Sequence, residues 1–148
     1  MAQPKEKKSQ PRFVGHAMIG NTLGTPIIQC DLFEEIQNLH KEDTWLQGTG
    51  PSSTTLVKHP DLRIVLLTMK KKMCMHQHST TARISVQTLA GHIRLRLPDR
   101  TVELPAGKLL ALDRCVSHDV EAEEDSAFLL TLSWPPKEDA KCVSDQQK

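Results

Sequence analysis

The sequence predicts an all-β protein, built as an antiparallel barrel or jelly roll with one short helix before it. Three observations lead to this fold class. From about residue 53 onward, apolar and polar residues alternate with a period of two, as in half-buried strands. Proline, glycine and aspartate interrupt this alternation about every 6–12 residues. Only one helical pattern occurs, and it precedes the strands. Separately, no apolar run approaches the roughly 18 residues that a membrane-spanning helix needs, so membrane insertion is not expected.

The alternation defines about nine strands. We expect them at 55–57, 63–69, 73–78, 83–90, 92–97, 101–104, 108–112, 117–122 and 127–134. Because successive side chains of a strand point to opposite faces, the strands can be given an inner and an outer face. This assignment places His118 inside, with Val120, and His92 outside, with Arg94.

The chain divides into four parts by composition. We expect a flexible N-terminal arm at 1–26, a helix and linker at 27–52, the barrel at 53–134 and a disordered C-terminal tail at 135–148. Within the second part, Asp31 and Glu34 form a helix-capping pattern. Apolar residues at helical spacing follow, so the short helix is predicted over 32–42.

The composition excludes several functions. The chain has 148 residues and a net charge of +1, so no global field favours nucleic acid or an anionic membrane. Tyrosine is absent and tryptophan occurs twice, which argues against a surface that stacks single-stranded bases. The four cysteines have no CxxC spacing and follow no signal peptide. We therefore expect reduced thiols in a cytoplasmic protein. The expected partner is a small molecule bound in the barrel, with no nucleic acid and no membrane.

Three histidines carry the strongest chemical signal. His76 and His78 stand two residues apart in a predicted strand, so both are expected on one face, together with Cys74. His118 comes from a later strand and points inward. If the two strands are neighbours, the three imidazoles can form one face of a divalent metal site.

Two motifs resemble those of the cupins, a family of small metal-binding barrels. The second cupin motif is matched in its spacing from a glycine to a histidine, here Gly107 to His118. Its usual proline, glycine and asparagine are replaced by Asp113, Cys115 and Ala122. The first motif is represented by His76, His78 and Gly91. The resemblance covers about residues 54–134 and implies a double-stranded β-helix, the cupin barrel.

The resemblance also implies a function, with one departure. The glutamate of the first motif has no counterpart, because Ala82 and Arg83 occupy its candidate positions and a guanidinium cannot ligate a metal. The implied site is then the neutral set His76, His78 and His118, which suits Fe, Ni, Cu or Zn. In cupins, three-histidine iron sites occur among small dioxygenases, which implies O2-dependent oxidation of a small anionic substrate. Cupins commonly pair, so a homodimer is expected.

Other residues and other functions remain open at this stage. Cys74 could be a soft ligand or a core cysteine, Cys115 could line the pocket or only complete a turn, and Gln87 could bind substrate or be an ordinary strand residue. The site could also belong to a non-catalytic metal or small-molecule sensor, or be vestigial in a barrel without metal. No GxSxG, glycine-rich phosphate loop or HExxH motif supports another catalytic class.

Overall fold

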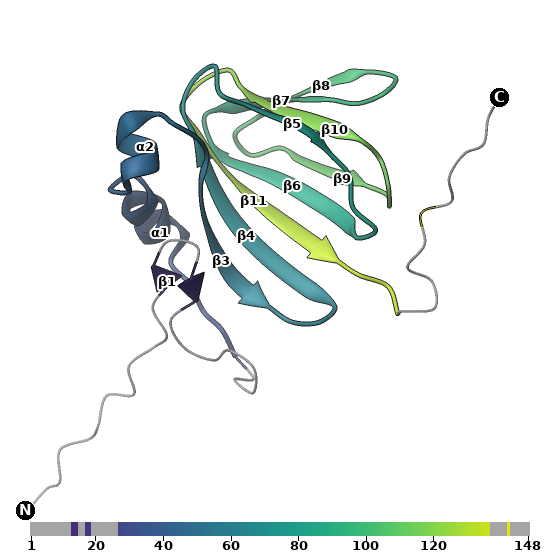
Figure 1. Cartoon of the computed structure of the whole chain (residues 1–148), viewed down its shortest axis with the longest axis horizontal. Helices are drawn as coiled ribbons and strands as arrows, with labels where there is room; N and C mark the ends of the chain where they lie inside the picture. Colours follow the sequence, from purple (N-terminus) through teal and green to yellow (C-terminus); the bar gives the residue numbers. More distant parts are fainter. Residues whose placement is uncertain (1–12, 15–16, 19–26, 137–141, 143–148) are drawn as a thin grey trace, which may run out of the picture.

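The computed structural model describes residues 13–14, 17–18, 27–136 and 142 of the chain (Figure 1). The elements, in chain order, are β1 (Phe13–Val14), β2 (Ala17–Met18), α1 (Leu32–Leu39), α2 (Asp43–Gln47), β3 (Ser52–Lys58), β4 (Leu62–Met69), β5 (Cys74–His78), β6 (Arg83–Ala90), β7 (His92–Arg96), β8 (Thr101–Pro105), β9 (Leu109–Leu112), β10 (His118–Ala122) and β11 (Ser126–Ser133).

The nine strands β3 to β11 form two antiparallel sheets that face each other. One sheet has the order β5-β10-β7-β8 and the other has the order β3-β4-β11-β6-β9. Figure 1 shows the two sheets as opposing layers, with the chain crossing between them several times. This arrangement confirms the predicted all-β jelly roll. The predicted strand positions are confirmed as well, with ends that differ by up to three residues.

The space between the sheets is filled by apolar side chains. Ile93 and Leu95 of β7 and Val86 of β6 are almost fully buried there. These residues belong to one continuous core cluster that also contains Val120 and Phe128. Ile93, Leu95, Val86 and Val120 come from the apolar half of alternating strands, which is why the period-two pattern located this part of the core.

A second apolar cluster lies on the other face of the five-stranded sheet, under α1. Ile36 and Leu39 of the helix pack there with Leu56 of β3 and Leu66 of β4. The predicted cap is confirmed, because a carboxylate oxygen of Asp31 accepts hydrogen bonds from the first amides of the helix.

The helix ends earlier than the pattern predicts, and a second helix follows. α1 stops at Leu39, and the amides of Lys41 and Glu42 bond to carbonyls only three residues back, which tightens the chain into a turn. The five-residue α2 was not predicted. It ends at Gly48, which adopts a left-handed conformation with φ of 63°.

The N-terminal arm contains one short paired element. Phe13 lies opposite Met18 in the two-residue ladder of β1 and β2. The prediction of a flexible arm did not include these strands. The rest of the arm, and the tail at 137–141 and 143–148, lie outside the described residues. Over the described part of the chain, no helix has the length and hydropathy to cross a bilayer.

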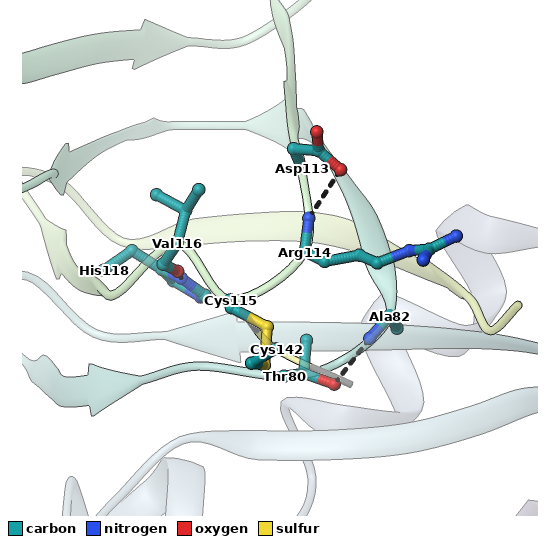
Figure 2. Close-up of a disulfide and its surroundings, with 8 residues drawn as sticks. All are labelled: Thr80, Ala82, Asp113, Arg114, Cys115, Val116, His118 and Cys142. Carbon is teal, nitrogen blue, oxygen red and sulfur yellow. Dashed lines mark hydrogen bonds between the residues drawn. A yellow bond between two sulfur atoms is a disulfide. The ribbon is translucent and has the colours of Figure 1, made fainter. Parts of the chain in front are cut away.

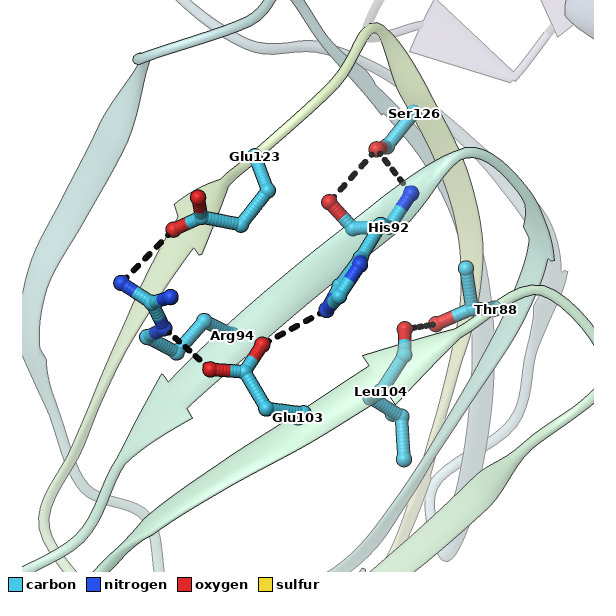
Figure 3. A network of polar contacts seen from close by, with 7 residues as sticks. All are labelled: Thr88, His92, Arg94, Glu103, Leu104, Glu123 and Ser126. Atoms are coloured by element: carbon cyan, nitrogen blue, oxygen red, sulfur yellow. Dashed lines mark hydrogen bonds and ion pairs between the residues drawn. The ribbon is translucent and has the colours of Figure 1, made fainter.

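The outer face of the four-stranded sheet is charged instead of apolar (Figure 3). His92 Nε2 lies 2.6 Å from a carboxylate oxygen of Glu103, and Arg94 Nε donates to the other oxygen at 2.6 Å. Arg94 also pairs with Glu123 at 2.8 Å. The outward orientation predicted for His92 and Arg94 is therefore confirmed.

Candidate metal centre

The candidate site lies where β5 runs antiparallel to β10, at one edge of the four-stranded sheet. His118 is the partner of His78, and Val120 is the partner of Met75. The step from Met75 to His78 covers three residues on β5, whereas the step from Val120 to His118 covers two on β10. The extra residue is a β-bulge in β5. A bulge shifts the alternation, so residues before and after it do not keep one common parity.

The bulge brings His78 to the same face as His118, because residues directly opposite each other in a ladder share a face. The centroids of the two imidazole rings are 6.3 Å apart and their planes are tilted by 41°. His118 is 8% exposed, whereas His78 is exposed. A metal ion lies about 2.0–2.1 Å from each imidazole nitrogen that binds it. One ion could therefore bridge the pair once the exposed His78 ring turns toward His118.

A backbone hydrogen bond fixes the orientation and the tautomer of the His118 ring. Its Nδ1 lies 3.0 Å from the carbonyl oxygen of Val116. A carbonyl only accepts hydrogen bonds, so Nδ1 carries the proton and donates it to Val116. In the neutral ring, Nε2 then keeps its lone pair. This is the arrangement by which proteins commonly prepare a histidine to bind a metal.

His76 does not join this pair. Cys74 lies opposite Glu121, on the outer face of the sheet, and the thiol of Cys74 is 3.6 Å from Nδ1 of His76. The expectation that Cys74, His76 and His78 share one face was wrong, because the bulge lies between His76 and His78. Burial, followed by the charges of Glu121 and Asp119, raises the pKa of the Cys74 thiol, which disfavours the thiolate that a metal needs.

The two residues at the position of the missing glutamate have structural contacts. Ala82 is fully buried in the core cluster. Arg83 is exposed, and its Nε donates to a carboxylate oxygen of Asp113 at 3.1 Å. Neither residue supplies an anionic ligand. The structure thus agrees with the expectation that these positions provide no carboxylate.

Of the two alternatives left open for Gln87, the structure supports the ordinary strand residue. Its side chain is exposed, while its neighbours Val86 and Thr88 are buried. The hydroxyl of Thr88 donates to the carbonyl of Leu104 at 2.9 Å, inside the protein. The pairing of β6 with β11 shifts by one residue between Thr88 and Ala90, and this bulge, together with the turn at Gly91, breaks the alternation between β6 and β7.

Cys115 lies in the turn before His118 and forms a disulfide with Cys142 (Figure 2). The expectation of four reduced thiols was therefore wrong for this pair, whereas Cys30 and Cys74 are free. No sequence spacing indicated the bond, because 27 positions separate the two cysteines. Cysteines so far apart are brought together only by the folded chain.

Taken together, two of the three predicted ligands converge. Among the residues that the structure describes, no group of three or more histidine, cysteine, aspartate or glutamate side chains is arranged to hold a metal. The contact between His118 and the carbonyl of Val116 was not predicted. A carbonyl acceptor has no sequence signature of its own, since every residue carries one.

Structural comparison places this barrel among known folds. A conserved protein of unknown function from Streptococcus pyogenes aligns with a TM-score of 0.62 at 21% identity, over 88% of this chain and 99% of that one. A cupin superfamily protein from Desulfitobacterium hafniense aligns with a TM-score of 0.56 at 13% identity, over 57% and 78%. Salicylate 1,2-dioxygenase from Pseudoaminobacter salicylatoxidans aligns with a TM-score of 0.61 at 14% identity, over 68% of this chain and 33% of that one. No family model and no curated protein matches the sequence.

Proposed function

We propose that this chain, which has the cupin fold, binds one divalent transition metal ion through His78 and His118. The observation that supports the proposal best is the hydrogen bond from Nδ1 of His118 to Val116, which leaves Nε2 as the metal-binding nitrogen. The partner histidine lies directly opposite, with a ring centroid 6.3 Å away. Two imidazole ligands suit Fe, Ni, Cu or Zn better than Mg.

The fit of the residues to a cupin metal site is partial. His78 and His118 suit the ion, whereas His76 is turned toward Cys74 and the glutamate position holds Ala82 or Arg83. With two protein ligands, the remaining coordination positions would be left to water or to a small anionic ligand. The ion itself would supply Lewis acidity and, if it is iron or copper, electron transfer.

Two consequences distinguish an enzyme from a binding protein. In an enzyme, the predicted O2-dependent oxidation of a small anionic substrate would take place at the open positions of the metal. In a sensor, the same positions would bind the anion without turnover. In both cases His118 would anchor the ion, and the apolar cluster around Val120 would limit the access of water from the core side.

A barrel without metal is a second candidate, and two observations favour it. The anionic ligand of the cupin motif is absent, and the bulge in β5 separates His76 from the other two histidines. In that case the barrel would serve as a binding or assembly domain.

Metal content and Ni(II) affinity test the proposal. We expect about one equivalent of metal in the untagged protein by mass spectrometry. Ni(II) affinity by calorimetry should fall at least about 10-fold in His118→Ala and His78→Ala. His76→Ala should bind like the wild type, and so should His59→Ala, a matched control in the turn before β4. The two-histidine proposal fails if His76→Ala weakens binding as much as His118→Ala. Absence of metal after reconstitution would instead support the metal-free barrel.

A further inference from the structure

Cys115 has a backbone conformation that a cysteine rarely adopts. Its φ is 65°, in the left-handed region where a side chain crowds the following carbonyl and glycine is the usual residue. A strained residue persists when its surroundings hold it there, and such residues cluster at functional sites.

Glycine would adopt this conformation without strain, but only a cysteine can form the disulfide with Cys142. Cys115 and Cys142 have Cα atoms 5.6 Å apart, and their bond attaches a segment beyond the last strand to the turn that leads into β10. Figure 2 shows the sulfurs beside Thr80, with Val116 and His118 following on the same turn.

This turn contacts both halves of the candidate metal centre. The amide of Cys115 donates to the carbonyl of Thr80 at 2.8 Å, and Thr80 comes two residues after His78. The next residue, Val116, accepts the Nδ1 hydrogen of His118. A change in the conformation of Cys115 would therefore move the residue that orients one histidine and the loop that follows the other.

We propose that the Cys115–Cys142 disulfide is a reversible, redox-sensitive cross-link that holds this turn, and with it His78 and His118, in the metal-binding geometry. The inference rests on the proposed function. Reduction breaks the Sγ–Sγ bond with two electrons and two protons taken from two thiols of a dithiol reductant, whose sulfurs are left joined as a disulfide. In a reducing compartment, such as the cytoplasm that the sequence predicts, the bond is exposed to reductants of this kind.

The rest of the turn has contacts that do not depend on the disulfide. A carboxylate oxygen of Asp113 accepts from Nε of Arg83 at 3.1 Å and from the amide of Arg114 at 2.8 Å. These bonds tie the start of the turn to β6 in both redox states. Reduction should therefore release the strained conformation of Cys115 while the barrel stays folded.

The test compares oxidised and reduced protein in a Cys30→Ser/Cys74→Ser background, so that only the disulfide pair remains. Thiol alkylation followed by mass spectrometry, across a series of dithiothreitol buffers, measures the fraction of the disulfide form. Ni(II) affinity is then measured by calorimetry after the reductant has been removed under inert gas. We expect one reversible two-electron transition and an affinity about 10-fold lower in the reduced form, the size of effect seen when a ligand loses its support.

Two variants separate the turn conformation from the sulfur chemistry. Cys142→Ser cannot form the bond, so it should bind Ni(II) like the reduced protein under all conditions. Cys115→Gly also lacks the bond, but glycine adopts the left-handed conformation without strain, so its affinity should stay near that of the oxidised protein. Circular dichroism checks that both variants are folded.

Two results would overturn the inference, and each is distinct from failure of the proposed function. The inference is rejected if the disulfide does not form in oxidised protein. It is also rejected if the two redox states bind Ni(II) with equal affinity while His118→Ala still weakens binding. If His78→Ala and His118→Ala leave Ni(II) affinity unchanged, the proposed metal site is rejected, whatever the redox titration shows.

Discussion

The two sheets share one core but differ in what covers their outer faces. The five-stranded sheet is apolar on both faces at β3 and β4, where α1 packs against Leu56 and Leu66. The four-stranded sheet carries an ion-pair network outside, centred on Glu103 and Arg94. The composition of the outer positions thus indicates whether a sheet face is covered or exposed to water.

Individual strand pairs differ in regularity within both sheets, and an irregular pair carries the candidate site. β11 and β4 pair from Ser126↔Met69 to Ser133↔Leu62 without a register shift. β5 and β10 pair over a shorter stretch that contains the bulge, and the two histidines lie at its end. Bulges are frequent next to functional sites because they turn individual side chains to a new face.

Removal of a side chain under the helix should have the largest effect on stability. Leu66 is fully buried between β4 and α1, so Leu66→Ala should lower the free energy of unfolding by about 2–5 kcal/mol. Urea denaturation measures the change. Leu109→Ala is the matched control, because Leu109 is 58% exposed and its truncation should change stability by about 0.5 kcal/mol or less. Similar losses in the two variants would contradict the covered-face interpretation.

The crossing between the sheets gives a second comparison. Gly91 joins β6 to β7 with φ of 77°, and a Cβ there would collide with the carbonyl of Asp125 and lie 2.5 Å from Oγ of Ser126. Gly107 has φ of 88° but open space around it. In thermal melts, Gly107→Ala should cost about 1–2 kcal/mol through the backbone alone. Gly91→Ala should lower the free energy of unfolding by about 1–3 kcal/mol more than Gly107→Ala does, because its methyl group is also crowded. Equal costs would show that the crossing adapts.

The charged outer face should give the smallest effect, visible as a pH dependence. The hydrogen bond from Arg94, followed by that with His92, lowers the pKa of Glu103 below its ordinary value of 4.5. Because the folded-state pKa is depressed, the stabilisation is present above the unfolded pKa and is lost as the pH falls through the folded pKa.

Glu103→Gln tests this sign. At pH 7 the variant should be less stable by about 1 kcal/mol at most, because the carboxylate is half exposed and screened by water. The difference in melting temperature between wild type and variant should begin to shrink as the pH falls below the ordinary pKa of 4.5, and should vanish only below the depressed folded-state pKa of Glu103. A gap that widens in acid would mean that the network does not stabilise the folded state.

Most of the fold was predictable because it depends on local patterns. The alternation of Ile93 and Leu95 with Arg94 predicts a strand with one wet face, and this is confirmed. The cap at Asp31 predicts the start of α1. The second helix was missed, because five residues are too few for a helical period to show. The expected homodimer stays a prediction.

The sequence by itself determined the strands, the apolar face of β7 and β10 with the inward His118, and the absence of an acidic residue at Ala82 and Arg83. Only the tertiary structure decided which histidines meet. A bulge arises from the pairing of two strands, so the parity of His76 and His78 cannot be read from β5 alone. The same holds for Cys115 and Cys142, whose bond requires two segments to meet in space. Local periodicity depends only on residues that are close in the sequence, whereas strand register and long-range contacts depend on how distant segments pair in the folded protein.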